Sequence, residues 1–375
     1  MKRPVAIVTP ALRDELDDGG PTLGILEIKE ARQRSAKFVV PARARAIVWR
    51  FWIEKGIAVI DALQLYALLW QLSQPWPWPA DWLRATRWTN LFNLDVLAFT
   101  ESGAAMGSTG VPYSLWGEMR LYWVYALTWA LVPFASAFAW ITASKRWHTS
   151  GHLDALARRL WWENVLLQCL YIVYLPIGLA VFRLINCDSK QRAAVDPYTF
   201  PVCYSTSHSS AVVLISGVLG GSFLLGFPWI LRHRILAFLP YRDAPSHERF
   251  VQSKEFEYMI GTSDTFLELY IPVFASFRRD SVTFPVEMCI VKLALLATFS
   301  FLRSTPPSKS YDGLQGTLFF LVFVYIAWQR TWMSMFRSPS TNRLTRILHW
   351  QLVANAFFGK SRISLHRSFI LTPLK

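Results

Sequence analysis

Six stretches of the chain are apolar and long enough to cross a lipid bilayer. Each holds about 18 to 25 residues, which at a rise of about 1.5 Å per residue matches a hydrocarbon core about 30 Å thick. A backbone inside the bilayer must satisfy its own hydrogen bonds, so we expect these stretches to be helices. The sequence therefore predicts an all-α, polytopic transmembrane helix bundle with spans at residues 56–74, 118–142, 164–185, 211–231, 283–302 and 314–336.

Two further apolar stretches, Phe266–Phe277 and Ile347–Phe358, are too short to cross a bilayer alone. We interpret both as interfacial or re-entrant helices, and the second alternatively as part of a clipped seventh span. These features divide the chain into three regions: a flexible basic cytoplasmic tail at residues 1–45, the transmembrane bundle at 46–345, and a basic C-terminal tail at 346–375.

The composition agrees with this assignment. Only 17% of the residues are charged and 53% are apolar, whereas soluble domains carry about 25% charged residues. The net charge of +14 is not gathered into one basic arm interleaved with aromatic residues, so we expect no nucleic-acid partner. The basic residues instead flank the apolar stretches, where they would meet anionic lipid headgroups. The expected partners are the lipid bilayer and either other membrane proteins or further copies of this chain.

The positions of lysine and arginine predict the orientation, because cytoplasmic loops retain positive charge. Most of the 39 basic residues lie before the first span, in the loops 144–160 and 232–280, and from Arg330 onward. The alternate loops hold few of them: 76–115, 186–210 and 303–312. Six spans would then place both termini in the cytoplasm, with the chain in the plasma membrane or a membrane of the secretory pathway.

Tryptophan residues are expected at the two headgroup levels, where amphipathic rings settle. One group lies in the first outer loop. The other is expected to form the opposite belt, on the side of the basic loops. The alternative interpretation of the first group is an aromatic cage for a soluble ligand. The two groups are Trp76, Trp78, Trp82, Trp88 and Trp116, and Trp147, Trp161, Trp162, Trp328 and Trp332.

The four cysteines fall into two classes. Cys187 and Cys203 lie in the same outer loop with fifteen residues between them. On the oxidising side of a membrane such a pair is predicted to form a disulfide, worth about 3 kcal/mol of loop entropy. The alternative is two free thiols in a reducing compartment. Cys169 and Cys289 fall inside spans, and we expect them to pack as small apolar residues.

Several ionisable residues lie in spans or at their ends, where each is expected to face the bundle interior and to have a partner. Glu287 and Lys292 are about 140° apart on one helix and are poorly placed to pair with each other. Glu287 with Arg183 is a candidate pair. The candidate polar pathway or buried brace comprises Arg183, Glu268, Glu287 and Lys292. The other ionisable residues of this kind are Asp61, Glu118, Arg120 and Glu163.

We find no motif for catalysis, a cofactor or a metal. His148 and His152 form one H-x-x-x-H pair, whereas a membrane diiron site needs several. No P-loop and no G-x-S-x-G motif is present. We therefore expect no enzyme activity and no cofactor. The small residues Gly217, Gly220, Gly221 and Gly226 in one span predict close helix contact, and Pro228 is expected to kink or end that helix.

From about residue 164 to 345, the order of features resembles the C-terminal polytopic membrane module of large repeat-containing cell-surface proteins of algae and protists. In that module a span ends at a cysteine, an outer loop carries an acidic residue, a second cysteine and a histidine, and the next span ends in proline. A tyrosine, an aromatic residue or proline, a glutamate and a basic residue follow. The corresponding residues are Cys187, Asp196, Cys203, His208 and Pro228, then Tyr270, Pro285, Glu287 and Lys292.

The resemblance implies a membrane-embedded output or anchoring module, loosely similar to transient-receptor-potential-like channels. The chain departs from that pattern in having no repeat domain ahead of its first predicted span. The expected function is a non-enzymatic, channel-like or signalling and anchoring module. The alternatives are a small-solute transporter and a purely structural subunit of a membrane assembly.

Overall fold

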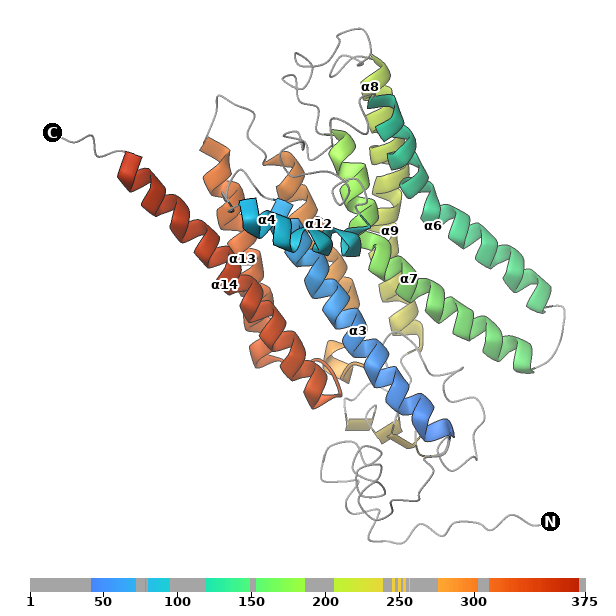
Figure 1. Cartoon of the computed structure of the whole chain (residues 1–375). Helices are drawn as coiled ribbons and strands as arrows, with labels where there is room; N and C mark the ends of the chain where they lie inside the picture. Colours follow the sequence, from blue (N-terminus) through green and yellow to red (C-terminus); the bar gives the residue numbers. More distant parts are fainter. Residues whose placement is uncertain are drawn as a thin grey trace, which may run out of the picture.

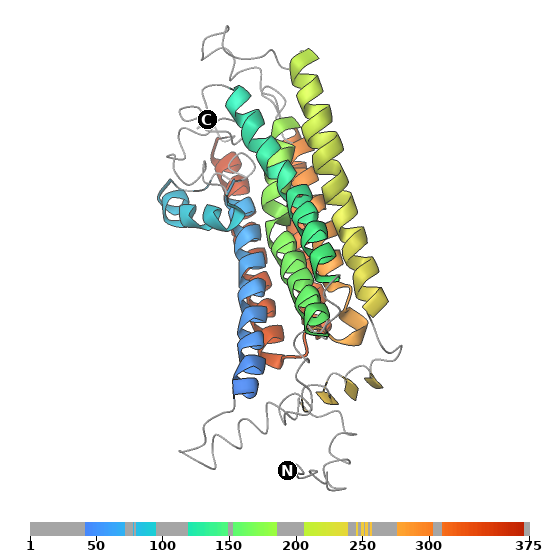
Figure 2. The same cartoon turned by 90° about the vertical axis from the view of Figure 1, so that its right-hand side faces the viewer.

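The computed structural model describes residues 42–71, 78, 80–94, 119–148, 153–185, 206–238, 276–302 and 310–370, together with a few residues between 245 and 256. This part of the chain is all-helical, apart from one isolated antiparallel bridge between Phe277 and Phe336. The long helices lie side by side in a bundle (Figures 1 and 2). The predicted fold class is therefore confirmed as helical for the described residues.

Every predicted span overlaps a long helix. The long helices are α3 (Ala42–Gln71), α6 (Met119–His148), α7 (Leu153–Ile185), α12 (Phe284–Phe301), α13 (Ser310–Trp332) and α14 (Pro339–Ile370). One further rod joins α8 (Thr206–Ala211), the π-helical segment η3 (Val212–Gly220) and α9 (Gly221–Phe238). Two short helices, α4 (Ala80–Thr86) and η1 (Arg87–Asn93), lie near the end of α3 (Figure 1).

Among the described residues, four helical segments are long and apolar enough to cross a membrane. They are Val124–Ser144, Trp162–Phe182, Ser209–Leu236 and Arg279–Phe301. Two other predicted spans lie on α3 and α13, which are long helices with more polar sequences. Helix α3 carries Glu54, Lys55 and Asp61, and α13 carries Gln329 and Arg330 near its end. A count of six or seven spans remains a prediction.

The apolar stretch Ile347–Phe358 lies inside the 32-residue helix α14. The predicted boundary between residues 345 and 346 therefore falls within a helix. Ser338 and Pro339 define the start of α14, because the Ser338 hydroxyl accepts a hydrogen bond from the Thr341 amide (3.4 Å) and proline suits the first helical turn. The stretch Phe266–Phe277 lies outside the described residues except for its last two positions, Ser276 and Phe277.

The bundle has two distinct ends. We call one the basic end: α3, α7, α12 and α14 begin there, and α9 and α13 finish there (Figures 1 and 2). Exposed arginines at this end include Arg232, Arg234, Arg278 and Arg343. The start of α3 and the finish of α14 lie at opposite ends of the bundle (Figure 1). Residues 1–41 of the predicted N-terminal tail lie outside the described part.

The outward faces of the helices are apolar. On α6 the exposed side chains include Val124, Leu131, Phe134, Phe138 and Ile141. Exposed apolar surface of this extent marks contact with lipid or with protein. Tryptophans are exposed along both ends of the bundle, with Trp52, Trp162, Trp328 and Trp332 toward the basic end and Trp82 and Trp88 toward the other. These positions agree with residence in a membrane.

Close packing is specific to one glycine in the α8–η3–α9 rod. A Cβ atom at Gly220 would meet both methyl groups of Val181 on α7, whereas one at Gly226 would have no neighbour within 4 Å. The prediction of close helix contact is therefore met at Gly220 and not at Gly226. Helix α9 continues through Pro228 to Phe238, so the helix does not end at this proline.

Candidate functional site

A buried ion pair joins α3 to α12. Lys292 is completely buried, and its Nζ atom lies 2.7 Å from Oδ1 of Asp61. The other carboxylate oxygen of Asp61 accepts a hydrogen bond from the hydroxyl of Tyr171 on α7 (2.6 Å). Lys292 and Tyr171 lie well inside two of the four segments that are long enough to cross a membrane. Three helices therefore meet at one charged cluster deep in the bundle.

Gln64 extends this cluster. Its side-chain oxygen accepts a hydrogen bond from Lys292 (3.1 Å), and its amide group donates to the backbone oxygen of Ile172 (2.8 Å) and to that of Phe92 (3.0 Å). Ile172 lies four residues before Pro176, and proline has no amide hydrogen to offer the carbonyl one turn earlier. The Gln64 side chain supplies the missing donor, as buried helices that contain proline require.

The polar atoms of the ion pair are well satisfied. Lys292 Nζ also lies 4.5 Å from the centre of the Tyr171 ring, a cation–π distance. A buried charge is tolerated only when it is paired and hydrogen-bonded, and removal of one partner typically costs about 3 to 5 kcal/mol. The cluster therefore fixes the relative positions of α3, α7 and α12.

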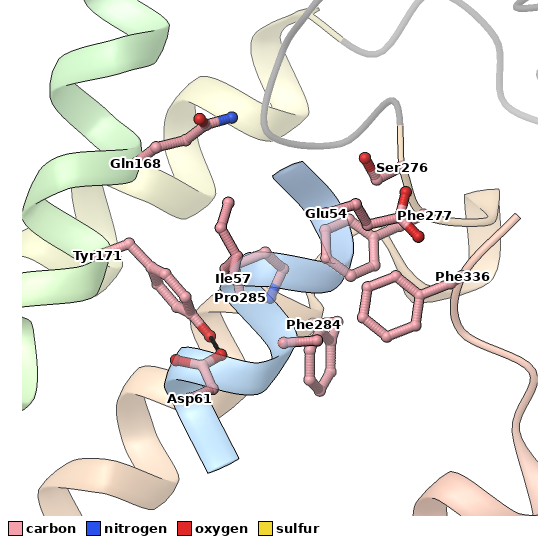
Figure 3. Close-up of a pocket in the computed structure, with 11 residues that line it drawn as sticks. Glu54, Ile57, Asp61, Gln168, Tyr171, Ser276, Phe277, Phe284, Pro285 and Phe336 are labelled. Atoms are coloured by element: carbon pink, nitrogen blue, oxygen red, sulfur yellow. Dashed lines mark hydrogen bonds between the residues drawn. The ribbon is translucent and has the colours of Figure 1, made fainter. Parts of the chain in front are cut away.

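A pocket of about 70 Å³ reaches this cluster. A cavity needs a volume of at least about 10 to 15 Å³ to hold one water molecule, so this pocket has room for several waters or one small solute. Figure 3 shows Glu54, Phe277 and Phe336 on one side of the pocket and Gln168 and Tyr171 on the other, with Asp61 hydrogen-bonded to Tyr171. The lining residues are Glu54, Ile57, Ala58, Asp61, Gln168, Tyr171, Ser276, Phe277, Phe284, Pro285 and Phe336.

A second buried cation lies beside this pocket without lining it. The Arg330 guanidinium is 3.6 Å from the centre of the Phe284 ring and contacts the sulfur atoms of Met288 (3.2 Å) and Met335. Arg330 is 3% exposed and makes no ion pair with any residue that the structure describes. The Arg330 guanidinium therefore contacts one aromatic face and two thioether sulfur atoms.

The structure describes the side chains of two predicted site residues, Lys292 and Glu287. Lys292 pairs with Asp61, while Glu287 is exposed and accepts hydrogen bonds from Thr283 (3.2 Å) and Gln329 (3.0 Å). The side chain of Arg183 lies outside the described part of the structure, so the suggested pair of Glu287 with Arg183 stays a prediction. Phe182, next to Arg183, contacts Phe301, which lies about 21 Å along α12 from Glu287 at the helical rise.

The remaining predicted positions lie outside the described residues. They are Glu268 and the two cysteines of the predicted disulfide, Cys187 and Cys203. The disulfide therefore stays a prediction. Of the two described cysteines, neither of which forms a disulfide, Cys289 is buried and Cys169 is exposed. Glu163 is buried and pairs with Arg234 (3.1 Å), whose side chain is 43% exposed, so this ion pair lies at the edge of the bundle.

Sequence reasoning identified Asp61 and Lys292 as ionisable residues within spans but did not join them, and it missed Gln64 and Tyr171. A signal was present, because Glu54, Asp61 and Gln64 share one face of α3 at helical spacing. A polar stripe on an otherwise apolar helix indicates a buried partner.

Comparisons with known protein families, with curated proteins and with solved structures found no match for this chain. The resemblance to the cell-surface protein module therefore remains a prediction. Within the described residues, no group of three or more histidine, cysteine, aspartate and glutamate side chains is arranged to hold a metal ion.

Proposed function

We propose that this chain is a non-enzymatic, multi-pass membrane protein that carries a small solute across the bilayer. The observation that supports the proposal best is a pocket between α3, α7 and α12 that is lined by Asp61, the acidic member of a buried ion pair. Ionisable residues inside membrane spans usually mark a transport pathway or a structural brace. Transporters hold their solute near the middle of the bilayer, between helices that move relative to one another.

The ion pair offers a physical basis for such movement. Asp61 and Lys292 join α3 to α12, and any solute or proton that competes for the Asp61 carboxylate weakens that connection. The nine-residue π-helical segment η3 packs against α7, where the Ser216 hydroxyl donates to the Val181 carbonyl (2.9 Å). Segments of π-helix are rare and frequently occur at functional sites. Both features favour a transporter over the channel-like module expected from the sequence.

We also propose seven spans, with α14 as the last, and the basic end in the cytoplasm of a plasma-membrane or secretory-pathway protein. The basic residues near the ends of α9 and α13 support this orientation, because positive charge is retained on the cytoplasmic side. Helix α14 packs along α13, with Trp350 and Phe357 in contact with α13 and with Ile347 and Phe358 exposed. An apolar outward face suits contact with lipid.

Thiol labelling tests the transporter proposal without knowledge of the solute. Ala58 lines the pocket one turn from Asp61 and is 6% exposed. In Ala58→Cys, a membrane-impermeant methanethiosulfonate should react from both faces of sealed vesicles, because alternating access opens the pocket to each side in turn. Ser340→Cys at the basic end and Ser210→Cys at the opposite end, both exposed, report the sidedness of the reagent. The unsubstituted chain measures reaction of the native cysteines.

Labelling of Ala58→Cys from one face alone, or from neither, would overturn the transporter proposal. The second candidate is a structural subunit, which the extensive hydrogen bonding of Asp61 and Lys292 favours. It predicts that Ala58→Cys is unreactive from the far face. A channel would instead carry a steady ionic current after reconstitution, and Glu287→Gln would change that current if Glu287 lined its path.

A further inference from the structure

We infer that the pocket beside the Asp61–Lys292 pair binds a small organic ammonium ion. This inference rests on the pocket being the solute site of the proposed function. Of the eleven lining residues, Glu54 and Asp61 are acidic and none is basic. Both carboxylates belong to α3, two helical turns apart and on the same face. A solute in the pocket would therefore contact carboxylate groups and no cationic group.

Four of the other nine lining residues are aromatic. Phe277, Phe284 and Phe336 contact one another with ring centres 4.9 to 6.0 Å apart, and Tyr171 faces them across the pocket (Figure 3). Carboxylates combined with aromatic faces are the groups that recognise alkylammonium ions, through charge attraction and cation–π contact. The chemistry of the walls therefore matches an apolar cation.

The protein already uses two of these rings to hold its own cations. Lys292 lies 4.5 Å from the centre of the Tyr171 ring, and Arg330 lies 3.6 Å from that of Phe284. Lys292 and Arg330 lie behind the pocket wall, so a solute would not touch them. Tyr171 and Phe284 thus already have a cation over one face, whereas no cation lies over Phe277 or Phe336 among the described residues.

An inorganic cation fits the pocket less well. Calcium takes about six to eight oxygen ligands and magnesium about six, many of them carboxylate or carbonyl groups. The pocket offers the two carboxylates, the Gln168 amide and the hydroxyls of Ser276 and Tyr171 among predominantly apolar walls. Both oxygens of the Asp61 carboxylate already accept a hydrogen bond, Oδ1 from Lys292 and Oδ2 from Tyr171, so Glu54 would be the main anionic contact of a solute. A larger ion with apolar substituents makes better use of the phenylalanine faces.

Two probes of the same shape test the inference on the full-length wild-type protein in detergent. Choline carries a quaternary ammonium, and 3,3-dimethyl-1-butanol replaces that nitrogen by carbon and is neutral. Binding is measured by calorimetry at constant ionic strength, with acetate as the anionic comparison. We expect choline to bind at least about tenfold more tightly than the neutral alcohol, from the charge and cation–π contributions together, and acetate not to bind.

A matched pair of variants then locates the site. Glu54→Gln should weaken choline binding at least about fivefold and leave binding of the neutral alcohol unchanged, because a charge-assisted contact is lost. Asp280→Asn removes an exposed carboxylate at the same end of the bundle, outside the pocket, and should change neither value.

Equal binding of choline and the alcohol would overturn the ammonium inference while leaving a solute pocket in place. Binding of acetate alone, or of none of the probes, would also overturn it. The transporter proposal is judged separately by labelling of Ala58→Cys, which uses no solute. The two proposals therefore fail through different measurements.

Discussion

The hydroxyl of Tyr174 on α7 donates a 2.7 Å hydrogen bond to the backbone oxygen of Leu224 on α9. Leu224 lies four residues before Pro228, so its carbonyl lacks the amide donor that the next turn of a helix normally supplies. Inside a membrane no water is available to replace that donor. Tyr174 and Gln64 thus perform the same task at two different prolines, each from a neighbouring helix.

A double-mutant cycle on Tyr174 and Pro228 tests this relationship. Tyr174→Phe should destabilise the protein by about 1 kcal/mol, within the range found for hydrogen bonds between membrane helices. In the Pro228→Ala background, where the amide donor is restored, the same substitution should cost close to nothing. Equilibrium unfolding in mixed detergent micelles measures each free energy. Equal costs of Tyr174→Phe in the two backgrounds would contradict the proposed coupling.

The sequence was sufficient to predict where the helices lie but not how they face one another. Apolar length predicted each long helix because a bilayer imposes a minimum span. It underestimated α3 and α14, whose described ranges begin at Ala42 and continue to Ile370, because charged and polar residues extend a helix beyond its apolar part. The helical state of these extensions is independent of their hydropathy.

The partner of Lys292 could not be predicted because Asp61 lies 231 residues away and the rotation of both helices about their axes decides the contact. The suggested pair of Glu287 and Arg183 stays a prediction, and the direction of the two helices bears on it. Helices α7 and α12 run parallel from the basic end, so a residue near the start of one lies far from a residue near the end of the other. The predicted topology gives the depth of each residue along its span, and that depth limits which residues of two helices can lie close enough to pair.

Breaking the Asp61–Lys292 pair on one side should be far more damaging than removing both charges. Asp61→Asn leaves the Lys292 ammonium buried without its counter-ion, and Lys292→Met leaves the carboxylate, so each should cost about 3 to 5 kcal/mol. The double variant should recover most of that loss, because no unpaired charge remains. Asp81→Asn serves as the control, since Asp81 and its partner Arg84 (3.6 Å) are both exposed and such pairs contribute at most about 1 kcal/mol. A loss from Asp61→Asn no larger than that of the control would refute a buried pair.

Two glycines of the same rod should respond oppositely to alanine. Gly220→Ala places a methyl group against Val181, and rotation of that side chain gives little relief because one γ-carbon or the other stays close. Overpacking of this kind costs about 1 to 3 kcal/mol. Gly226→Ala meets no atom within 4 Å, so it should be neutral or stabilise by up to about 1 kcal/mol through higher helix propensity. Unfolding midpoints of the two variants provide the comparison, and a similar loss in both would contradict the close contact at Gly220.

The course of α14 decides on which side of the membrane the C-terminus lies. The apolar part between Arg346 and Lys360 covers about 20 Å at the helical rise, less than a bilayer core, and the basic side chains at its two ends can extend toward the headgroups. Because α14 lies along α13 and ends opposite the start of α3 (Figure 1), we expect it to cross. A protease-cleavable tag before Met1 and another after Lys375 should then be accessible from opposite faces of sealed vesicles. A tag inserted between Ser338 and Pro339 is the internal reference and should share the face of the first tag. Both terminal tags accessible from one face would establish an even number of spans and place α14 on the membrane surface.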